Sequence, residues 1–298
     1  MDRIDVLRIF VRVVETRSFT RAADSLQMPR STVSSAIQTL EARMGTRLLA
    51  RTTRSVSPTP NGSIFHTHCL RLIADMDEAE RLFLDEASHV TGLVRVDLPG
   101  RIGRLIVCPA LPEFLERHPD IEVELGMSDR VVNLVENAID CVLRVGPLED
   151  SSLVVRKLGE LTLINVASPA YLARHGMPRS PNDLPEHVAV RYASPSTGRI
   201  EDWEWMDGDT PRRVLMRGRV TVNSAEALIA CAIAGLGLIQ IPAYDVRDQL
   251  QAGTLVEVLG AWRSEALPIS LLYPHRQHLS RRVRLFSDWL ENVLRAWL

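Results

Sequence analysis

The sequence predicts a chain of three parts: a small α+β domain of helices and a strand pair, a long linker helix, and a larger α/β domain of two lobes. Apolar side chains recur at helical spacing up to Gly45, an apolar seam runs from Phe65 to Phe83, and short strand and helix patterns alternate after residue 92. With 298 residues, 46% of them hydrophobic and 24% charged, the chain has enough apolar material for two or three globular units.

Two helices open the first domain. The first is predicted between Ile4 and Thr16, because its apolar side chains share one helical face: Leu7, Phe10, Val11 and Val14. The hydroxyl residues Ser18 and Thr20 then provide caps for a short second helix that ends by Gln27. Alanines at positions 22 and 23 allow this second helix to pack closely on its neighbour.

A third helix is predicted from Pro29, which suits a helix start, to Gly45, which ends it. Its buried stripe is Val33, Ile37, Leu40 and Met44. The opposite face is polar and carries little charge; it consists of Arg30, Ser31, Thr32, Ser34, Ser35 and Gln38. Arginine can contact guanine with two hydrogen bonds, and serine and glutamine reach base edges or phosphates. This face is therefore predicted to enter a DNA major groove.

A strand, a turn and a strand follow over residues 48–56, with Arg51 and Arg54 at the tip. Helices two and three followed by this hairpin make a winged helix-turn-helix, whose wing would touch phosphates or the minor groove. Residues 1–58 hold ten arginines and five carboxylates, whereas the whole chain has a formal net charge of −2. The domain is therefore expected to bind double-stranded DNA, with Thr20 and Thr53 completing the predicted contacts. A three-helix protein-binding module is the alternative.

The linker is predicted over residues 59–90. A break at 57–62 precedes a seam with steps of four and three residues: Phe65, Cys69, Leu72, Met76, Ala79 and Phe83. About thirty helical residues would span roughly 45 Å, enough to separate two DNA-binding domains. The seam predicts that the helix pairs with a second copy of itself, but it also allows packing on its own body.

The remaining residues, 91–298, carry an α/β pattern. Strands are predicted at 93–98, 121–125 and 139–144, with helices at 102–117 and 131–137. A second unit opens near Ala167 and runs to Leu259, after which a strand at 269–273 and a helix from about Leu279 return to the first unit. The division expected is one lobe of about 91–165 and 266–298 and another of about 166–265.

These residues resemble the LysR type of bacterial transcription regulator. The DNA-binding domain of that family is matched by the runs at 18–23, 29–34 and 40–49 and by Arg51 and Arg54. The body resembles the family's effector domain, which is similar to periplasmic solute-binding proteins, in the runs at 114–119, 139–146, 167–172, 222–227 and 234–237. Pro29 stands where a hydroxyl cap is usual and Ser35 where a basic residue is frequent. Arg30 is therefore expected to carry more of the base reading.

The resemblance implies a homodimer or homotetramer that binds a small effector between the lobes, with RNA polymerase as a further partner. Strand ends and helix N-termini that face such a cleft favour an anionic or polar ligand. The candidate lining residues are Pro99, Gly100, Arg101, Ser128, Arg144, Ser194, Thr197, Asn223 and Ser224. Relatives often have a hydroxyl near position 100; here backbone N–H groups, Arg101 or Arg144 would hold an anion. Both arginines could equally be structural.

Other classes of function are disfavoured. The sequence has no G-x-S-x-G, P-loop or H-E-x-x-H motif, so we expect no enzyme, and we expect no cofactor. The pairs His66 with His68 and His275 with His278 lack partners at metal-ligand spacing and are interpreted as surface residues. A solute-binding or scaffold protein without affinity for DNA is the alternative, and the basic first domain argues against it.

The four cysteines, Cys69, Cys108, Cys141 and Cys231, are far apart in the sequence, and we interpret them as packing thiols. A redox sensor is the alternative, but it would need an exposed thiol near a resolving partner. Neither a spanning apolar run nor a signal peptide is visible, which predicts a cytoplasmic protein without a membrane partner.

Overall fold

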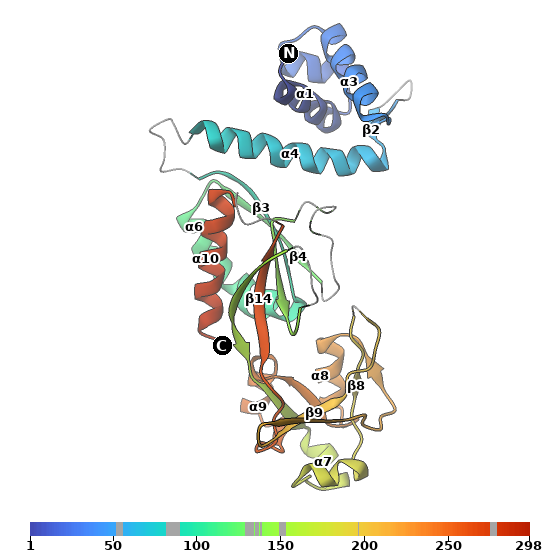
Figure 1. Ribbon diagram of the computed structural model, residues 1–298, viewed down its shortest axis with the longest axis vertical. Helices are drawn as coiled ribbons and strands as arrows, with labels where there is room; N and C mark the ends of the chain where they lie inside the picture. Colours follow the sequence, from blue (N-terminus) through green and yellow to red (C-terminus); the bar gives the residue numbers. More distant parts are fainter. Residues whose placement is uncertain are drawn as a thin grey trace.

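The computed structural model describes residues 1–51, 56–81, 90–128, 134, 137, 139–148, 153–195, 197–274 and 279–298; at 51 and 77–81 it describes the backbone alone. A helical N-terminal domain lies at one end of the long axis, a single long helix crosses below it, and two lobes follow (Figure 1). The C-terminus lies in the lobe nearer the long helix.

Three helices form the N-terminal domain: α1 (Arg3–Thr16), α2 (Phe19–Ser25) and α3 (Arg30–Met44). Asp2 and Asp5 form a capping box at the start of α1, and the hydroxyl of Ser18 accepts a hydrogen bond from the N–H of Arg21 at 3.3 Å. The predicted apolar stripes meet in one core, which includes Phe10, Ala22, Ala23, Val33, Ile37 and Leu40. Met44 is the exception: it was predicted in the buried stripe of the third helix, but it lies in the last turn of α3 and is exposed. The three helices predicted from the sequence are confirmed.

An antiparallel pair of strands, β1 (Leu49–Arg51) and β2 (Val56–Pro58), forms the base of the predicted wing. The carboxylate of Glu41 on α3 accepts hydrogen bonds from the N–H groups of Leu48 and Leu49 at 2.9 and 3.0 Å. This pairing holds the first strand against α3. The tip of the predicted wing, residues 52–55, lies outside the described residues.

The linker helix α4 (Pro60–Arg81) begins two residues after the end of β2. Gly62 lies so close to β1 that a Cβ atom there would be 1.8 Å from the carbonyl oxygen of Leu48. Phe65 and Cys69 pack into the core of the N-terminal domain, whereas Leu72 and Met76 are exposed. The predicted seam is therefore divided: its first half packs on the chain's own body, and the second half, as far as it is described, faces solvent.

A five-stranded sheet forms the lobe nearer α4. Its order is β4-β3-β5-β14-β6, with β14 antiparallel to both neighbours and the pairs of β3 parallel. The bounds are β3 (Gly92–Leu98), β4 (Ile121–Met127), β5 (Cys141–Val145), β6 (Val154–Leu161) and β14 (Leu267–Tyr273). The strands predicted at 93–98, 121–125, 139–144 and 269–273 are confirmed within a few residues. The helix predicted at 131–137 falls mostly outside the described residues.

Helices cover one face of this sheet (Figure 1). The segment predicted as one helix at 102–117 is a run of three pieces: α5 (Gly100–Ile102), the π-turn η1 (Gly103–Val107) and α6 (Cys108–Arg117). The last helix, α10 (Arg281–Arg295), packs Phe286, Trp289 and Leu290 into the same core as Phe114 of α6. This core positions the N-terminus of α5 at the end of β3.

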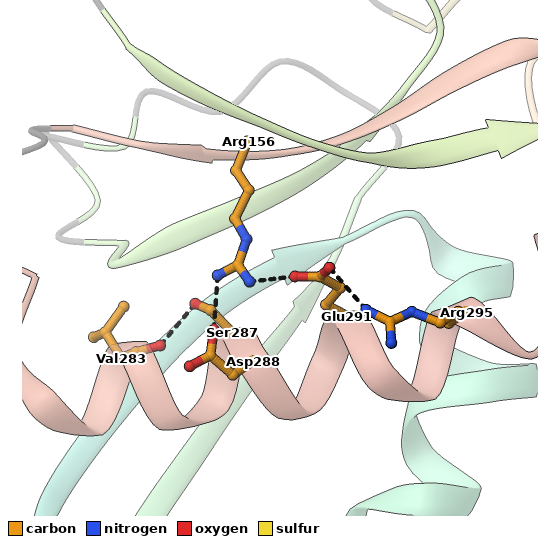
Figure 2. A network of polar contacts seen from close by, with 6 residues as sticks. All are labelled: Arg156, Val283, Ser287, Asp288, Glu291 and Arg295. Carbon is orange, nitrogen blue, oxygen red and sulfur yellow. Dashed lines mark hydrogen bonds and ion pairs between the residues drawn. The ribbon is translucent and has the colours of Figure 1, made fainter.

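A polar network fastens α10 to the sheet (Figure 2). Arg156 of β6 lies 2.8 Å from Asp288 and also pairs with Glu291, which lies 3.2 Å from Arg295 one turn later. The hydroxyl of Ser287 donates to the carbonyl of Val283 at 2.7 Å. The carboxylates raise the pKa of Arg156 against the opposing effect of burial, so its charge is retained.

The second lobe is built on the antiparallel sheet β12-β7-β13, with β7 (Leu163–Ala167), β12 (Ile239–Pro242) and β13 (Val256–Val258). Two pairs complete its strands: β8 (Arg191–Tyr192) with β11 (Thr221–Val222), and β9 (Trp203–Asp207) with β10 (Thr210–Val214). Its helices are α7 (Pro169–His175), η2 (Pro181–Glu186), α8 (Ala225–Ile233), η3 (Ala243–Val246) and α9 (Arg247–Gln251). The chain passes between the two sheets twice, after β6 and before β14.

Candidate DNA interface and candidate effector cavity

The polar face of α3 is directed away from the core. Val33, Ala36, Ile37 and Leu40 are buried on one side, and helical geometry leaves the predicted DNA-binding residues on the other. Arg30, Ser31, Ser35 and Gln38 are exposed, while Thr32 and Ser34 are half-buried. The first turn of α3 therefore presents one guanidinium among small hydroxyl side chains, which permits close approach to a groove.

The turn before α3 fixes the angle between the second and third helices. Gln27 adopts a left-handed conformation with φ of 53°, and the N–H of Met28 donates to the carbonyl of Ala23 at 3.0 Å. Pro29 occupies the N-cap position and supplies no side-chain hydrogen bond. Thr20 is exposed in the first turn of α2. A helix of this kind, joined by a tight turn to the one before it, is the usual reader in helix-turn-helix proteins.

The structure places only part of the predicted wing. Arg51 ends β1, and its side chain is not described; Thr53 and Arg54 lie outside the described residues. The strand that leads to them is fixed by the hydrogen bonds to Glu41 and by pairing with β2. The base of the predicted wing, β1 with β2, is therefore held beside α3.

A cavity of about 350 Å³ lies between the two lobes. It is lined by Gly100, Arg101, Arg104, Cys108, Met127, Ser224, Ala225 and Glu226. The first four lie in the helical run from α5 to α6 in the first lobe, and Met127 ends β4 of the same lobe. The last three lie at the start of α8 in the second lobe. Pockets for small ligands start at about this size. Three predicted effector-binding residues, Gly100, Arg101 and Ser224, are thus brought together.

Arg101 is the polar centre of this region, with a side chain only 8% exposed. Its Nε lies 2.5 Å from a carboxylate oxygen of Asp245, and its NH2 donates to the backbone carbonyl of the same residue. Its NH1 lies 2.7 Å from Glu226. Since Asp245 and Glu226 both belong to the second lobe, Arg101 joins the lobes and is already bound to two carboxylates.

The two carboxylates differ in exposure. The side chain of Asp245 is 4% exposed, whereas that of Glu226 is 54% exposed. Burial raises the pKa of Asp245 to about 6, and Arg101 offsets part of that rise. Glu226 also lies 2.7 Å from Arg104, whose side chain is 58% exposed. The cluster therefore has a buried half, Arg101 with Asp245, and a half that faces the cavity, Glu226 with Arg104.

The other predicted effector-binding residues do not line this cavity. Pro99 is the N-cap of α5, and the N–H of Ser128 donates to the carbonyl of Leu98 at 3.0 Å. Arg144 is paired with Asp97 at 2.9 Å. Ser194 and Thr197 form a turn in which the hydroxyl of Ser194 accepts from the N–H of Thr197 at 3.4 Å, and Asn223 is exposed before α8.

The sequence interpretation missed Arg104, Cys108, Met127, Glu226 and Asp245. Arg104 and Cys108 had a visible signal, because they follow Arg101 at helical spacing of three and seven residues. Glu226 and Asp245 had none, since Asp245 is 144 positions from Arg101 along the chain.

Two interpretations of side chains need correction. Cys108 is exposed and lines the cavity, so describing it as a packing thiol is wrong, although Cys69 and Cys141 are buried, and burial raises the pKa of Cys69 to about 12. His66 is half-buried beside Phe10, with ring centroids 6.3 Å apart, and is no surface residue. Desolvation lowers its pKa and favours the neutral ring.

Two features are absent from the part of the chain that the structure describes. No helix there has the length and apolar character required to cross a membrane. Nor does any group of three His, Cys, Asp or Glu side chains in the described ranges lie close enough to hold a metal ion.

Comparison with protein families gives two matches that together span most of the chain. Residues 4–63 match the bacterial regulatory helix-turn-helix protein, lysR family. Residues 87–295 match the LysR substrate binding domain. The first match covers α1 to the start of α4, and the second covers both lobes.

Individual relatives agree with these matches. The chain is 42% identical over the full length of both proteins to the uncharacterized HTH-type transcriptional regulator YhjC of Escherichia coli K12. The structure of the present chain is similar to that of CrgA, a LysR-type regulator from Neisseria meningitidis. The TM-score is 0.62 at 31% identity, with 97% of this chain and 98% of CrgA covered. The full-length Vibrio cholerae virulence activator AphB gives a TM-score of 0.60 at 31% identity, with 98% and 99% covered.

Proposed function

The chain belongs to the LysR family of transcriptional regulators, and on that basis we propose that α3 reads a specific DNA sequence under the control of a small ligand bound between the lobes. The observation that supports this most directly is the exposed face of Arg30, Ser31, Ser35 and Gln38 on a helix whose other face is buried. Arg30 makes the principal base contact, and the hydroxyl residues position the helix on phosphates and base edges.

The division of labour follows the order of the chain. Residues 1–58 bind DNA, residues 59–90 link and pair two copies, and residues 91–298 bind the effector. The exposed Leu72 and Met76 on α4 support pairing of the linker, because they extend an apolar stripe whose first half is already buried. A homodimer or homotetramer places two reading helices in successive major grooves, about 34 to 36 Å apart or a multiple of it.

The effector is a small anionic or polar molecule. The cavity between the lobes supports this assignment, because two arginines and the first turn of α8 line it. A ligand that bridges Arg101 or Arg104 to α8 favours one relative position of the lobes over others, and a shift in that population changes the spacing of the paired DNA-binding domains. RNA polymerase is a further partner of the DNA-bound regulator.

Selection from a random pool of duplexes tests this function. The full-length protein should enrich a sequence with two related half-sites separated by one helical turn or a multiple of it. Enrichment of unrelated sequences, with no shared motif after repeated rounds, would contradict sequence reading. Failure to retain any duplex would leave a plain solute-binding protein as the better description.

A further inference from the structure

The side chain of Glu226 occupies a carboxylate-binding position between the lobes. One of its oxygens lies 2.7 Å from NH1 of Arg101, and the other lies 2.7 Å from NH2 of Arg104. Two guanidinium groups thus hold the two oxygens of a single carboxylate. Charge-assisted hydrogen bonds of this kind are the usual way in which proteins bind carboxylate ligands.

From this geometry we infer that Glu226 is an internal stand-in for the ligand: a small carboxylate binds Arg101 and Arg104 by displacing the side chain of Glu226. The inference rests on the proposed function and adds the chemical class of the effector and the contact that it replaces. Until a ligand arrives, Glu226 holds α8 of the second lobe against α5 and η1 of the first.

The exposures of the partners make this exchange feasible. The side chains of Glu226 and Arg104 are 54% and 58% exposed, so the side chain of Glu226 can rotate out into solvent at little cost in free energy. Arg101 keeps its place after the exchange, because the buried Asp245 holds its Nε and NH2. Arg101 and Arg104 then present the N–H groups that Glu226 has left, at the spacing that the two oxygens of a carboxylate span.

The remaining walls define the rest of the ligand. Met127, Ala225 and the methylene and sulfur of Cys108 give the cavity an apolar side, and Gly100 leaves space because no atom lies within 4 Å of where its Cβ would be. A volume of about 350 Å³ is small for a ligand pocket. The ligand class is therefore a small carboxylate with an apolar body.

Cys108 provides a probe inside the cavity. Its exposed thiol can be alkylated by iodoacetate, which carries a carboxylate, or by iodoacetamide, its neutral counterpart of similar size. The measurement is the ratio of the two rates at Cys108 in the full-length protein, followed by peptide mass spectrometry. The same ratio at Cys231, which does not line the cavity, corrects for the intrinsic reactivity of the reagents.

The Glu226→Gln variant removes the negative charge that pairs with both arginines and leaves the shape of the side chain nearly unchanged. Its corrected ratio should exceed that of the wild type by about fivefold, the discrimination that an ion pair at an exposed site supplies. In Glu226→Gln with Arg104→Gln the ratio should return to near the wild-type value. Glu257→Gln, which breaks an ion pair with Arg263 away from the cavity, is the matched control and should leave the ratio unchanged.

Two results would overturn the inference. One is an unchanged ratio in Glu226→Gln. The other is an equal rise in the double variant, since that would show that Arg104 does not hold the carboxylate of the reagent. Binding to the selected DNA is measured on the same preparations. If the wild-type protein does not bind this DNA, the proposed function is contradicted. If it binds the DNA and the alkylation ratio in Glu226→Gln is unchanged, only the role of Glu226 is contradicted.

Discussion

The guanidinium of Arg282, at the start of α10, lies 2.8 Å from the carboxylate of Asp75 on the linker helix α4. Its Nε also donates to the backbone carbonyl of Leu93 at 3.1 Å, and its side chain is only 2% exposed. Gly92 permits this arrangement, because it has a φ of 114° and a Cβ there would lie 3.3 Å from Arg282. The last helix of the chain thus connects the linker to the sheet of the effector domain.

Replacing Arg282 should weaken this junction. In Arg282→Met, the carbonyl of Leu93 and the carboxylate of Asp75 lose a charged donor, and we expect the free energy of unfolding to fall by about 2 kcal/mol. Arg282→Lys should not restore it, because one ammonium group cannot reproduce the planar fork that spans both acceptors. Urea denaturation followed by circular dichroism measures the change. The exposed Arg284→Met is the control, and equal stability of the two methionine variants would contradict the account.

Gly62 should be intolerant of a side chain. A Cβ atom at this position would lie 1.8 Å from the backbone oxygen of Leu48, which also accepts the N–H of Thr59 at 2.9 Å. Gly62→Ala must therefore displace α4 from the wing, at a cost of about 1 to 3 kcal/mol. Thermal unfolding of Gly62→Ala beside Gly100→Ala, whose Cβ meets nothing within 4 Å, provides the comparison. A Gly62→Ala variant as stable as Gly100→Ala would show that this close approach is unimportant.

Arg30 should control discrimination between DNA sequences more than overall affinity. Removing a side chain that contacts a base costs about 1 to 3 kcal/mol of discrimination, while phosphate contacts elsewhere are retained. Arg30→Ala should therefore lower the affinity ratio of selected to unrelated duplex by about tenfold or more. Arg43→Ala, in the exposed last turn of the same helix, should leave this ratio near that of the wild type. An unchanged ratio in Arg30→Ala would contradict the proposal that Arg30 of α3 makes the principal base contact.

The pH dependence of stability should carry a contribution from Asp245. Its pKa is about 6 in the folded protein, against an ordinary value of 3.8, so between these values the folded state binds a proton that the unfolded chain releases. The contribution is full below the lower value and is lost as pH rises through the upper one. Relative to Asp245→Asn, the wild type should lose about 1 to 2 kcal/mol of unfolding free energy between pH 5 and pH 7.

Denaturation of both proteins over this range, at constant ionic strength, gives the difference directly. A difference that stays flat would mean that attraction to Arg101 cancels the effect of burial on the pKa of Asp245. A difference that grows with rising pH would mean that the attraction outweighs burial, which would reverse the sign assigned to the pKa shift.

Much of the fold follows from local patterns in the sequence. The stripe of Val33, Ile37 and Leu40 predicted the buried side of α3, and the strand pattern at 93–98 predicted β3, an inner strand of the larger sheet, because both signals lie within one element. The seam of α4 was less informative. Phe65 and Cys69 have the same spacing as Leu72 and Met76, and only the position of the N-terminal domain decides which pair is buried.

The candidate effector site was predicted in part. Gly100 and Arg101 line the cavity because they lie between the strand predicted at 93–98 and the helix predicted at 102–117, and Ser224 lies in the run at 222–227 that resembles the family. The partners of Arg101 could not be predicted, since Glu226 and Asp245 reach it only through the packing of one lobe on the other. Arg144 was an equally good candidate by sequence, yet it pairs with Asp97 in its own sheet.

Competitive binding to DNA tests the central claim most directly. The full-length protein is titrated with the DNA upstream of its own reading frame and with the selected duplex, each against unrelated competitor, over a series of salt concentrations. We predict binding that survives the competitor and weakens steeply as salt rises, because the arginines of residues 1–58 displace counterions from phosphates. Binding that the competitor abolishes on both fragments would contradict sequence-specific recognition by this chain.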